Sequence, residues 1–188
     1  ISRAREVLKV YAEFSANAPD ELYTDFVMLH PPEGGGPVAL INICYSGDAR
    51  NADKVLAPLK KLGEPLANTV ASVDYVAIQQ SADNADPRSG GDYMKWGFTN
   101  EINDSLIQAI PEFFEPHPDR LSWMFFQQAG GAIARVNAGA TAFAHRYASH
   151  ALAVVATWNP GVDHAPHFSY VRNYWKELKP HTRGFYTN

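Results

Sequence analysis

The sequence predicts an α+β domain, in which an antiparallel β-sheet carries helices on one face and leaves the other face open. Apolar residues recur with helical spacing near both ends of the chain, and six short apolar runs typical of strands lie between them. Two pairs of these runs are separated by short loops instead of helices, which favours hairpins over a strict βαβ alternation. The 188 residues, 46% of them hydrophobic and 19% charged, suit one globular domain.

The first half of the chain predicts a helix, a hairpin and two further helices. Val7, Leu8, Tyr11 and Phe14 have helical spacing, and Pro19 marks the end of that helix. The segments that follow are strands at 23–30 and 37–45, joined by the glycine-rich loop 31–37, a helix at 48–63 and a short helix at 73–84.

The second half predicts four strands and two helices. Asn103 or Asp104 caps a helix that runs through Phe114, and Pro180 ends the last helix. The other segments are a strand at 92–98, strands at 121–128 and 131–136 joined as a tight hairpin, a strand at 150–158 and the last helix at 165–178.

The strand at 121–128 carries large apolar side chains on both of its sides. Met124 and Phe126 point one way, and Trp123 and Phe125 point the other. Strands that are apolar on both sides are buried on both faces of a sheet. Because the helices cover only one face, we expect another domain, another chain or a ligand to cover the second.

Composition excludes some classes of function. The net charge of −4 and the absence of a basic run argue against a nucleic-acid partner. The lone Cys44 lies within an apolar strand, where we expect a small buried hydrophobe, and it fits a reducing, cytoplasmic location. No apolar stretch approaches the length of a membrane span, and no signal peptide is visible. Since the chain does not open with methionine, we expect residue 1 not to be the natural start.

The usual motifs of nucleotide, nucleophile and metal sites are missing. The three glycines at 34–36 lie in a hairpin loop, and no G-x-G-x-x-G, G-K-[ST] or G-x-S-x-G pattern occurs. Two histidine pairs, at 145 and 150 and at 164 and 167, lack a cysteine or carboxylate to complete a ligand set. We therefore expect no metal site.

Polar residues within the predicted strands are candidate ligand contacts. A two-residue hairpin loop would place Gln128 and Arg135 on one face, where they orient a ligand or form a solvated sheet end. Tyr93 and Lys95 alternate along the strand at 92–98, and Lys95 pairs with an anion or is an ordinary surface lysine.

Four stretches taken together resemble one family. They are "INICYSGDARNADKVLAPLKKLGEPLANTV", "YMKWGFTNEI", "QQAGGAIARVNAGATAFAHR" and the closing "RGFYTN". In this order, they resemble the C-terminal half of the berberine-bridge-type FAD-linked oxidases over nearly the whole chain. "GGAIARV", "ATAFAHR" and the final Y-x-N pattern are the most specific parts.

The resemblance implies the substrate-binding half of an FAD-dependent oxidoreductase that oxidises an alcohol, sugar or related small molecule. Residues 1–180 would form the substrate domain, with its open sheet face over the flavin ring. Residues 181–188 would return to an N-terminal FAD-binding domain that this chain lacks, so we do not expect the chain alone to hold FAD.

The resemblance also assigns roles to individual residues. Tyr186 matches a tyrosine that helps to remove the substrate hydroxyl proton, and Asn188 matches an asparagine that contacts the flavin region. Arg135 stands about where plant members carry a glutamate base. Because an arginine cannot act as a base near neutral pH, a tyrosine-based alcohol or sugar oxidation fits better.

Two other interpretations stay open. One is a free-standing α+β ligand-binding or dimerisation module that buries its open face against a second copy. The other is an enzyme that uses Tyr186 or the histidines without flavin. Residues upstream of Ile1 in the parent reading frame would distinguish them.

Overall fold

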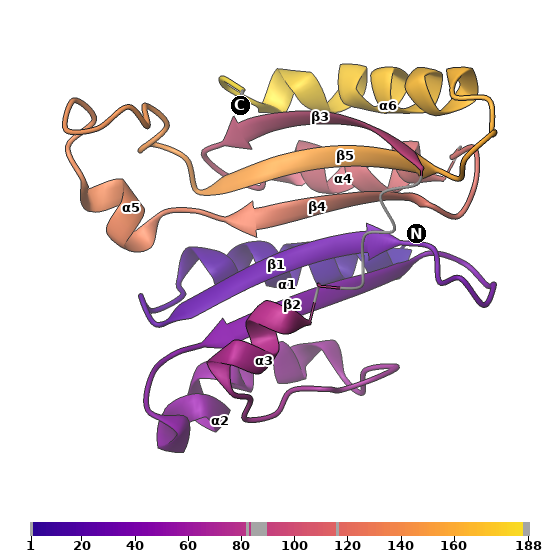
Figure 1. Ribbon diagram of the computed structural model, residues 1–188. Helices are drawn as coiled ribbons and strands as arrows, with labels where there is room; N and C mark the ends of the chain where they lie inside the picture. Colours follow the sequence, from indigo (N-terminus) through magenta and orange to yellow (C-terminus); the bar gives the residue numbers. More distant parts are fainter. Residues whose placement is uncertain (1, 82, 84–89, 116, 186–188) are drawn as a thin grey trace.

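A computed structural model describes residues 2–81, 83, 90–115 and 117–185 and contains a five-stranded antiparallel sheet. The strand order across the sheet is β2-β1-β4-β5-β3, so β2 and β3 are the edges (Figure 1). The strands are β1 (Leu22–Leu29), β2 (Val38–Tyr45), β3 (Gly91–Thr99), β4 (Ser122–Gln128) and β5 (His150–Trp158). The predicted α+β class is confirmed.

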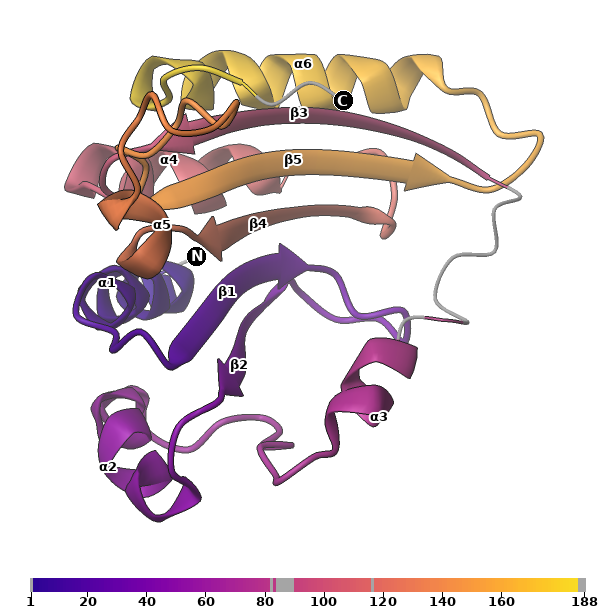
Figure 2. The same ribbon diagram turned by 60° about the vertical axis from the view of Figure 1, so that its left-hand side comes forward.

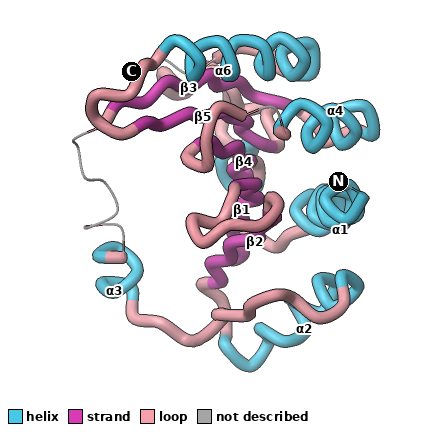
Figure 3. Tube along the Cα trace, turned by 90° about the vertical axis from the view of Figure 1, so that its right-hand side faces the viewer, coloured by secondary structure: helices cyan, strands magenta, loops and turns pink. Residues whose placement is uncertain are grey.

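Three long helices cover one face of the sheet. They are α1 (Ser2–Ala16), α4 (Asp104–Phe114) and α6 (Ala165–Leu178), and Figure 3 shows α1 and α4 on the same side of the strands. Asn103 caps α4 as predicted, since its side-chain oxygen accepts a hydrogen bond from the Leu106 amide at 3.0 Å. The short elements are α2 (Ala52–Leu56), α3 (Tyr75–Gln80), α5 (Gly131–Arg135) and three 3₁₀ turns, η1 (Ala49–Asn51), η2 (Ala57–Leu62) and η3 (Lys179–His181).

The main core lies between the sheet and these helices. Phe26, Phe126 and Leu152 are neighbours across β1, β4 and β5 and are fully buried. Tyr11 of α1 and Val171 of α6, also fully buried, pack in the same cluster. The period of two in the strands and the helical spacing in α1 and α6 thus turn their apolar residues toward one layer.

The predicted hairpin at 121–136 is wrong. Residues 131–135 form α5, because Gly130 (φ 93°) and Gly131 (φ 48°) turn the chain out of the sheet and helix-favouring alanines follow. The partner of β4 is β5, and the amide of Ala129 donates to the carbonyl of Ser149 at 2.7 Å. We call the excursion of residues 131–149 the α5 loop; it extends beyond one end of the sheet (Figure 2).

The expectation that Cys44 is buried is also wrong, since its side chain is exposed. Cys44 lies on edge strand β2 and pairs with Tyr23, on the face opposite the helices. A strand residue that points away from the helix layer has no core to enter.

Residues 64–81, including α3, stand away from the sheet on the side opposite α1 and α4 (Figure 3). Leu66 is 96% exposed and Tyr75 is 71% exposed. Such a concentration of exposed apolar side chains is unusual on a soluble monomer. Within the described part of the chain, no helix has both the length and the hydropathy that membrane crossing requires.

Candidate functional site

The sheet face opposite α1, α4 and α6, which we call the open face, is the first candidate site. Figure 1 views the sheet from this side, with α1 and α4 behind it. Residues paired across antiparallel strands share a face. One row across the open face therefore consists of Asn42 (β2), Asp25 (β1), Gln127 (β4), Ala151 (β5) and Phe98 (β3).

Three adjacent polar side chains mark this row. Asp25 pairs with Asn42 on one side and with Gln127 on the other, so a carboxylate lies between two carboxamides. The next row is apolar, with Val27 beside Leu40 and Phe125. A polar trio beside an apolar row is the pattern of a ligand site, where a few polar groups fix orientation.

Asp25 is the ionisable centre of the trio. The hydroxyl of Tyr23 donates a hydrogen bond to Asp25 Oδ1 at 2.5 Å. Burial raises the pKa of Asp25, although the Tyr23 hydrogen bond opposes that shift. Burial and the neighbouring carboxylate raise the pKa of Tyr23 as well, so Tyr23 keeps its proton at neutral pH. The pair therefore holds a carboxylate of increased basicity with a proton donor beside it.

Aromatic side chains form the floor next to the trio. The rings of Trp123 and Phe125 are stacked with their centroids 5.0 Å apart, and Trp96 meets Phe125 edge to face at 5.3 Å. Phe125 and Val155 are buried on this face, whereas Met94 at one edge is 41% exposed. The floor thus presents an aromatic and aliphatic surface.

Among the described residues, the open face offers no cationic strand residue for phosphate groups. By the register of the described sheet, none of the strand residues on the open face is lysine or arginine. A ligand that carries phosphate groups would therefore need donors for them from elsewhere.

The α5 loop closes one end of the open face. Phe143 packs edge to face on Phe98 with ring centroids 5.9 Å apart, and His145 stacks on Phe98 at 4.3 Å. Ala148 and Ala151 complete this small cluster. The row that contains Asp25 and Gln127 therefore ends beneath the α5 loop.

Gln128, predicted as a substrate contact, lies on the helix-covered face. Its Oε1 accepts hydrogen bonds from the amide and the hydroxyl of Thr24 at 3.0 and 2.8 Å. Its Nε2 donates to the carbonyl of Ser15 at 3.2 Å. These hydrogen bonds join β4 to β1 and α1, whereas the neighbouring Gln127 lies on the open face. The assignment of Gln128 to substrate binding stays a prediction.

Arg135 lies at the end of α5, not on a second strand of a hairpin. Its guanidinium makes an exposed two-point ion pair with Asp20, in which Nη1 donates to Oδ1 at 3.0 Å. The pair lowers the pKa of the Asp20 carboxyl. The contact ties the α5 loop to the turn before β1.

Tyr93 and Lys95 are brought together, but on the helix-covered side of edge strand β3. The Tyr93 ring lies against Phe168 of α6, with centroids 4.5 Å apart. Arg172 and Lys95 place their charges 5.6 and 5.5 Å from the same ring. Hydrogen bonding from Arg172, together with Lys95, lowers the pKa of Tyr93. Their assignment to substrate binding stays a prediction.

Tyr186 and Asn188 lie outside the described residues, and so do their assigned roles. Tyr23, Asp25, Asn42 and Gln127 were not predicted as site residues from the sequence. The signal was present, because Asp25 is the one charged residue of β1 and Asn42 interrupts the apolar run of β2. Only the strand pairing brings these two positions together.

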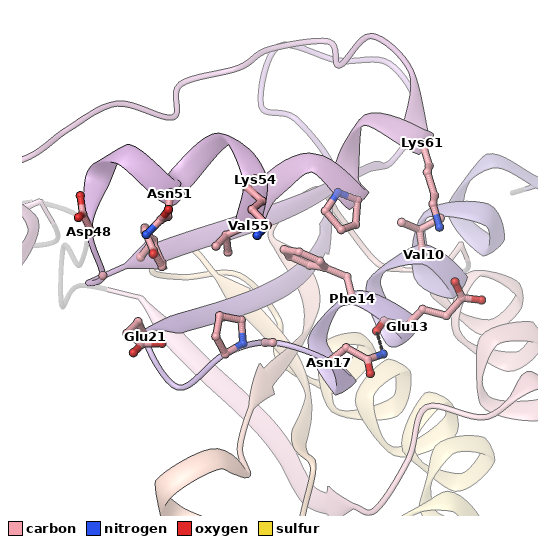
Figure 4. A pocket seen from close by; sticks show the side chains of 15 residues that line it. Val10, Glu13, Phe14, Asn17, Glu21, Asp48, Asn51, Lys54, Val55 and Lys61 are labelled. Atoms are coloured by element: carbon pink, nitrogen blue, oxygen red, sulfur yellow. Dashed lines mark hydrogen bonds between the residues drawn. The ribbon is translucent and has the colours of Figure 1, made fainter.

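A groove between α1 and the α2–η2 segment is a second hollow, with a volume of about 770 Å³ (Figure 4). Phe14, Val10 and Val55 form its apolar lining, and its charged side chains are exposed. They are Glu13, Glu21, Asp48, Lys54 and Lys61. Because the charged side chains of this groove are all exposed, whereas Asp25 on the open face is half-buried, we take the open face as the better candidate.

The histidines do not assemble a metal centre. Among the described residues, no group of three or more His, Cys, Asp or Glu side chains is arranged to hold a metal ion. His30 and His117 approach each other, with their Nε2 atoms 3.0 Å apart. His167 instead contacts Asp119 Oδ2 at 2.6 Å.

Comparison with known proteins places the chain beside FAD-linked oxidoreductases. No protein-family model matches it. It is 26% identical to the uncharacterized FAD-linked oxidoreductase YgaK of Bacillus subtilis over 189 residues, which cover 96% of the chain and 40% of YgaK. The chain therefore spans about 40% of the length of that curated relative.

Solved structures share the fold. BBE-like 1 of Physcomitrella patens superposes with a TM-score of 0.78 at 18% identity, over 96% of this chain and 41% of that one. The carbohydrate oxidase of Microdochium nivale, in complex with a substrate analogue, gives a TM-score of 0.76 at 16% identity, over 95% and 41%. GilR, an oxidoreductase in complex with pregilvocarcin, superposes with a TM-score of 0.77 at 16% identity, over 98% of this chain and 42% of that one. The predicted resemblance to the C-terminal part of berberine-bridge-enzyme-like FAD-linked oxidoreductases is confirmed.

Proposed function

We propose that this chain is the substrate-binding part of an FAD-dependent oxidoreductase that oxidises an alcohol or sugar hydroxyl. The observation that carries the proposal is the Tyr23–Asp25 pair, a carboxylate of raised pKa on the open face. Substrate would bind over Asp25, Asn42 and Gln127, which share one row.

The flavin would be supported by the apolar floor. Trp96, Phe125 and Trp123 would supply apolar contacts to the ring system, and the remainder of a longer parent protein would hold the phosphates. When bound, FAD supplies the two-electron acceptor for hydride. The open face then excludes water from the reacting carbon and orients its hydroxyl group.

Tyr23 and Asp25 would remove the hydroxyl proton. In our scheme, the substrate O–H gives its proton to Tyr23 Oη while Tyr23 passes its own proton to Asp25 Oδ1, along the 2.5 Å hydrogen bond. The electron pair of the broken O–H bond forms the carbonyl π bond as hydride leaves the carbon. Burial makes Asp25 a stronger base, and ionised Asp25 is the form that accepts the proton.

Substrate class is inferred from relatives and from the residues present. The Microdochium nivale protein is a carbohydrate oxidase, and carboxamide pairs such as Asn42 and Gln127 suit hydroxyl-rich ligands. Tyr186 is proposed as a second proton acceptor and Asn188 as a flavin contact, on the family resemblance. Cytoplasmic location is proposed from the lone cysteine.

The test is the pH dependence of flavin reduction in the longer parent protein. In anaerobic stopped-flow measurements, we expect Asp25→Asn to slow reduction roughly 100-fold and to abolish the fall in rate at low pH. Asp92→Asn is the matched control, since Asp92 is an exposed aspartate on the same face at the far end of β3. Reduction by Asp25→Asn within a few-fold of the parent, with its acidic limb intact, would contradict the proposal.

A further inference from the structure

The "ATAFAHR" stretch, one of the most specific parts of the sequence resemblance, closes one end of the open face but has no role in the proposed reaction. In the structure this stretch lies in the α5 loop and ends next to the C-terminal segment. Tyr147, one residue beyond it, donates a hydrogen bond from its hydroxyl to the carbonyl of Arg183 at 2.7 Å. The loop and the closing segment, 36 residues apart, are thus joined directly.

The contact has a defined direction. Because the Tyr147 hydroxyl gives its single proton to Arg183, its oxygen accepts from His145, whose Nδ1 lies 3.2 Å away. His145 is held in turn by stacking on Phe98, with ring centroids 4.3 Å apart. Stacking and hydrogen bonding together fix the ring that orients Tyr147.

The backbone of the closing segment is fixed at the same point. The Arg183 amide donates to the Phe98 carbonyl at 2.7 Å, and Phe98 and Arg183 form an isolated antiparallel bridge. Two glycines make room for it. A Cβ on Gly97 would lie 2.9 Å from Thr182, and one on Gly184, which has φ 67°, would lie 2.5 Å from His145. Both positions are intolerant of a side chain.

This anchorage lies on the row that carries the proposed site. Phe98, Ala151, Gln127 and Asp25 are successive neighbours across the sheet, and Arg183 extends that row by one position. At about 4.8 Å per strand, Gln127 is about 10 Å from Phe98 along the row.

We propose that Tyr147, oriented by His145, is a positioning residue. It fixes residues 182–185 at the end of the row that carries Gln127 and Asp25, and this fixed segment bounds the substrate space over that row. The inference rests on the proposed function. It assigns to the "ATAFAHR" stretch the task of placing the closing segment, without contact between Tyr147 and substrate.

Trypsin tests the anchorage in the 188-residue chain, which carries its own core. The bond after Arg183 is a tryptic site that must leave Phe98 before cleavage. We expect Tyr147→Phe, which keeps the ring and loses the hydroxyl, to be cleaved there roughly 3- to 10-fold faster, the usual scale for one partly exposed hydrogen bond. Tyr75→Phe is the matched control, because Tyr75 is 71% exposed and far from this contact in the fold. Cleavage after exposed Lys60 is the internal reference.

The functional test uses the longer parent protein. Tyr147→Phe should lower the rate of flavin reduction at saturating substrate about 10-fold, while the dissociation constant of the substrate and the melting temperature change little. Unchanged cleavage after Arg183 would overturn the inference, and so would faster cleavage with an unchanged reduction rate while Asp25→Asn remains slow. If Asp25→Asn also reduces its flavin normally, the proposed function fails instead, and the inference that rests on it falls with it.

Discussion

Replacing His150 by glutamine should remove much of the acid sensitivity of this fold. His150 begins β5 and is 3% exposed, between Tyr11 and Phe126. Its ring nitrogens lie 3.0 Å from the hydroxyls of Ser149 and Ser15, which suit a neutral imidazole. Burial lowers its pKa from 6.5 to about 4.

The sign and size of the effect follow from that shift. As pH falls below 6.5, the unfolded chain takes up a proton at this position before the folded chain does, so the folded state loses stability until about pH 4. Between pH 7 and pH 5 the loss from His150 alone amounts to about 2 kcal/mol.

The loss of stability is measured by urea unfolding at pH 7 and at pH 5, with tryptophan fluorescence as the signal. His150→Gln lowers stability at both pH values through lost packing, but the difference between the two values should be about 2 kcal/mol smaller than in the unchanged chain. Other histidines contribute equally to both proteins and cancel. Equal pH dependence in the two proteins, within about 0.5 kcal/mol, would refute the assignment of a neutral buried His150.

Three further predictions concern the surfaces. Cys44 should react with a thiol reagent in the folded chain nearly as fast as in urea, because it is exposed; slow reaction would mean that something covers the open face. Leu66→Ser should change the free energy of unfolding by less than about 0.5 kcal/mol, whereas Leu106→Ala, at a fully buried position of α4, should cost about 2–5 kcal/mol; equal costs would show that residues 64–81 pack on the body. The exposed apolar side chains at Leu66 and Tyr75 should make the chain self-associate on concentration in light scattering, and a monodisperse monomer would count against an uncovered interface.

The local pattern of apolar residues was enough to predict most of the helices and strands and their arrangement as a sheet with helices on one face. The last helix was predicted at 165–178 and forms at Ala165–Leu178. Its two signals, the helical spacing of apolar residues and the terminating Pro180, are both local in the sequence. The two-sided apolar pattern of β4 likewise predicted a second buried face before any partner was known. The bounds of a helix and the apolar pattern of a strand depend on residues that are close in the sequence, so they can be predicted from the sequence alone.

The site was decided by the tertiary structure. Gln127 and Gln128 are indistinguishable as letters, and only the register against β1 sends one to the open face and the other to Thr24 and Ser15. Ala129 and Gly130 were predicted as a hairpin loop and Gly131 as the start of a strand, yet the positive φ angles of Gly130 and Gly131 start α5 and move Arg135 away from the sheet to Asp20. Strand register is a long-range property, since it is fixed by which residues a distant strand and the helix layer can accept. The sequence therefore determines which side chains are available, and pairing across the sheet decides which of them meet.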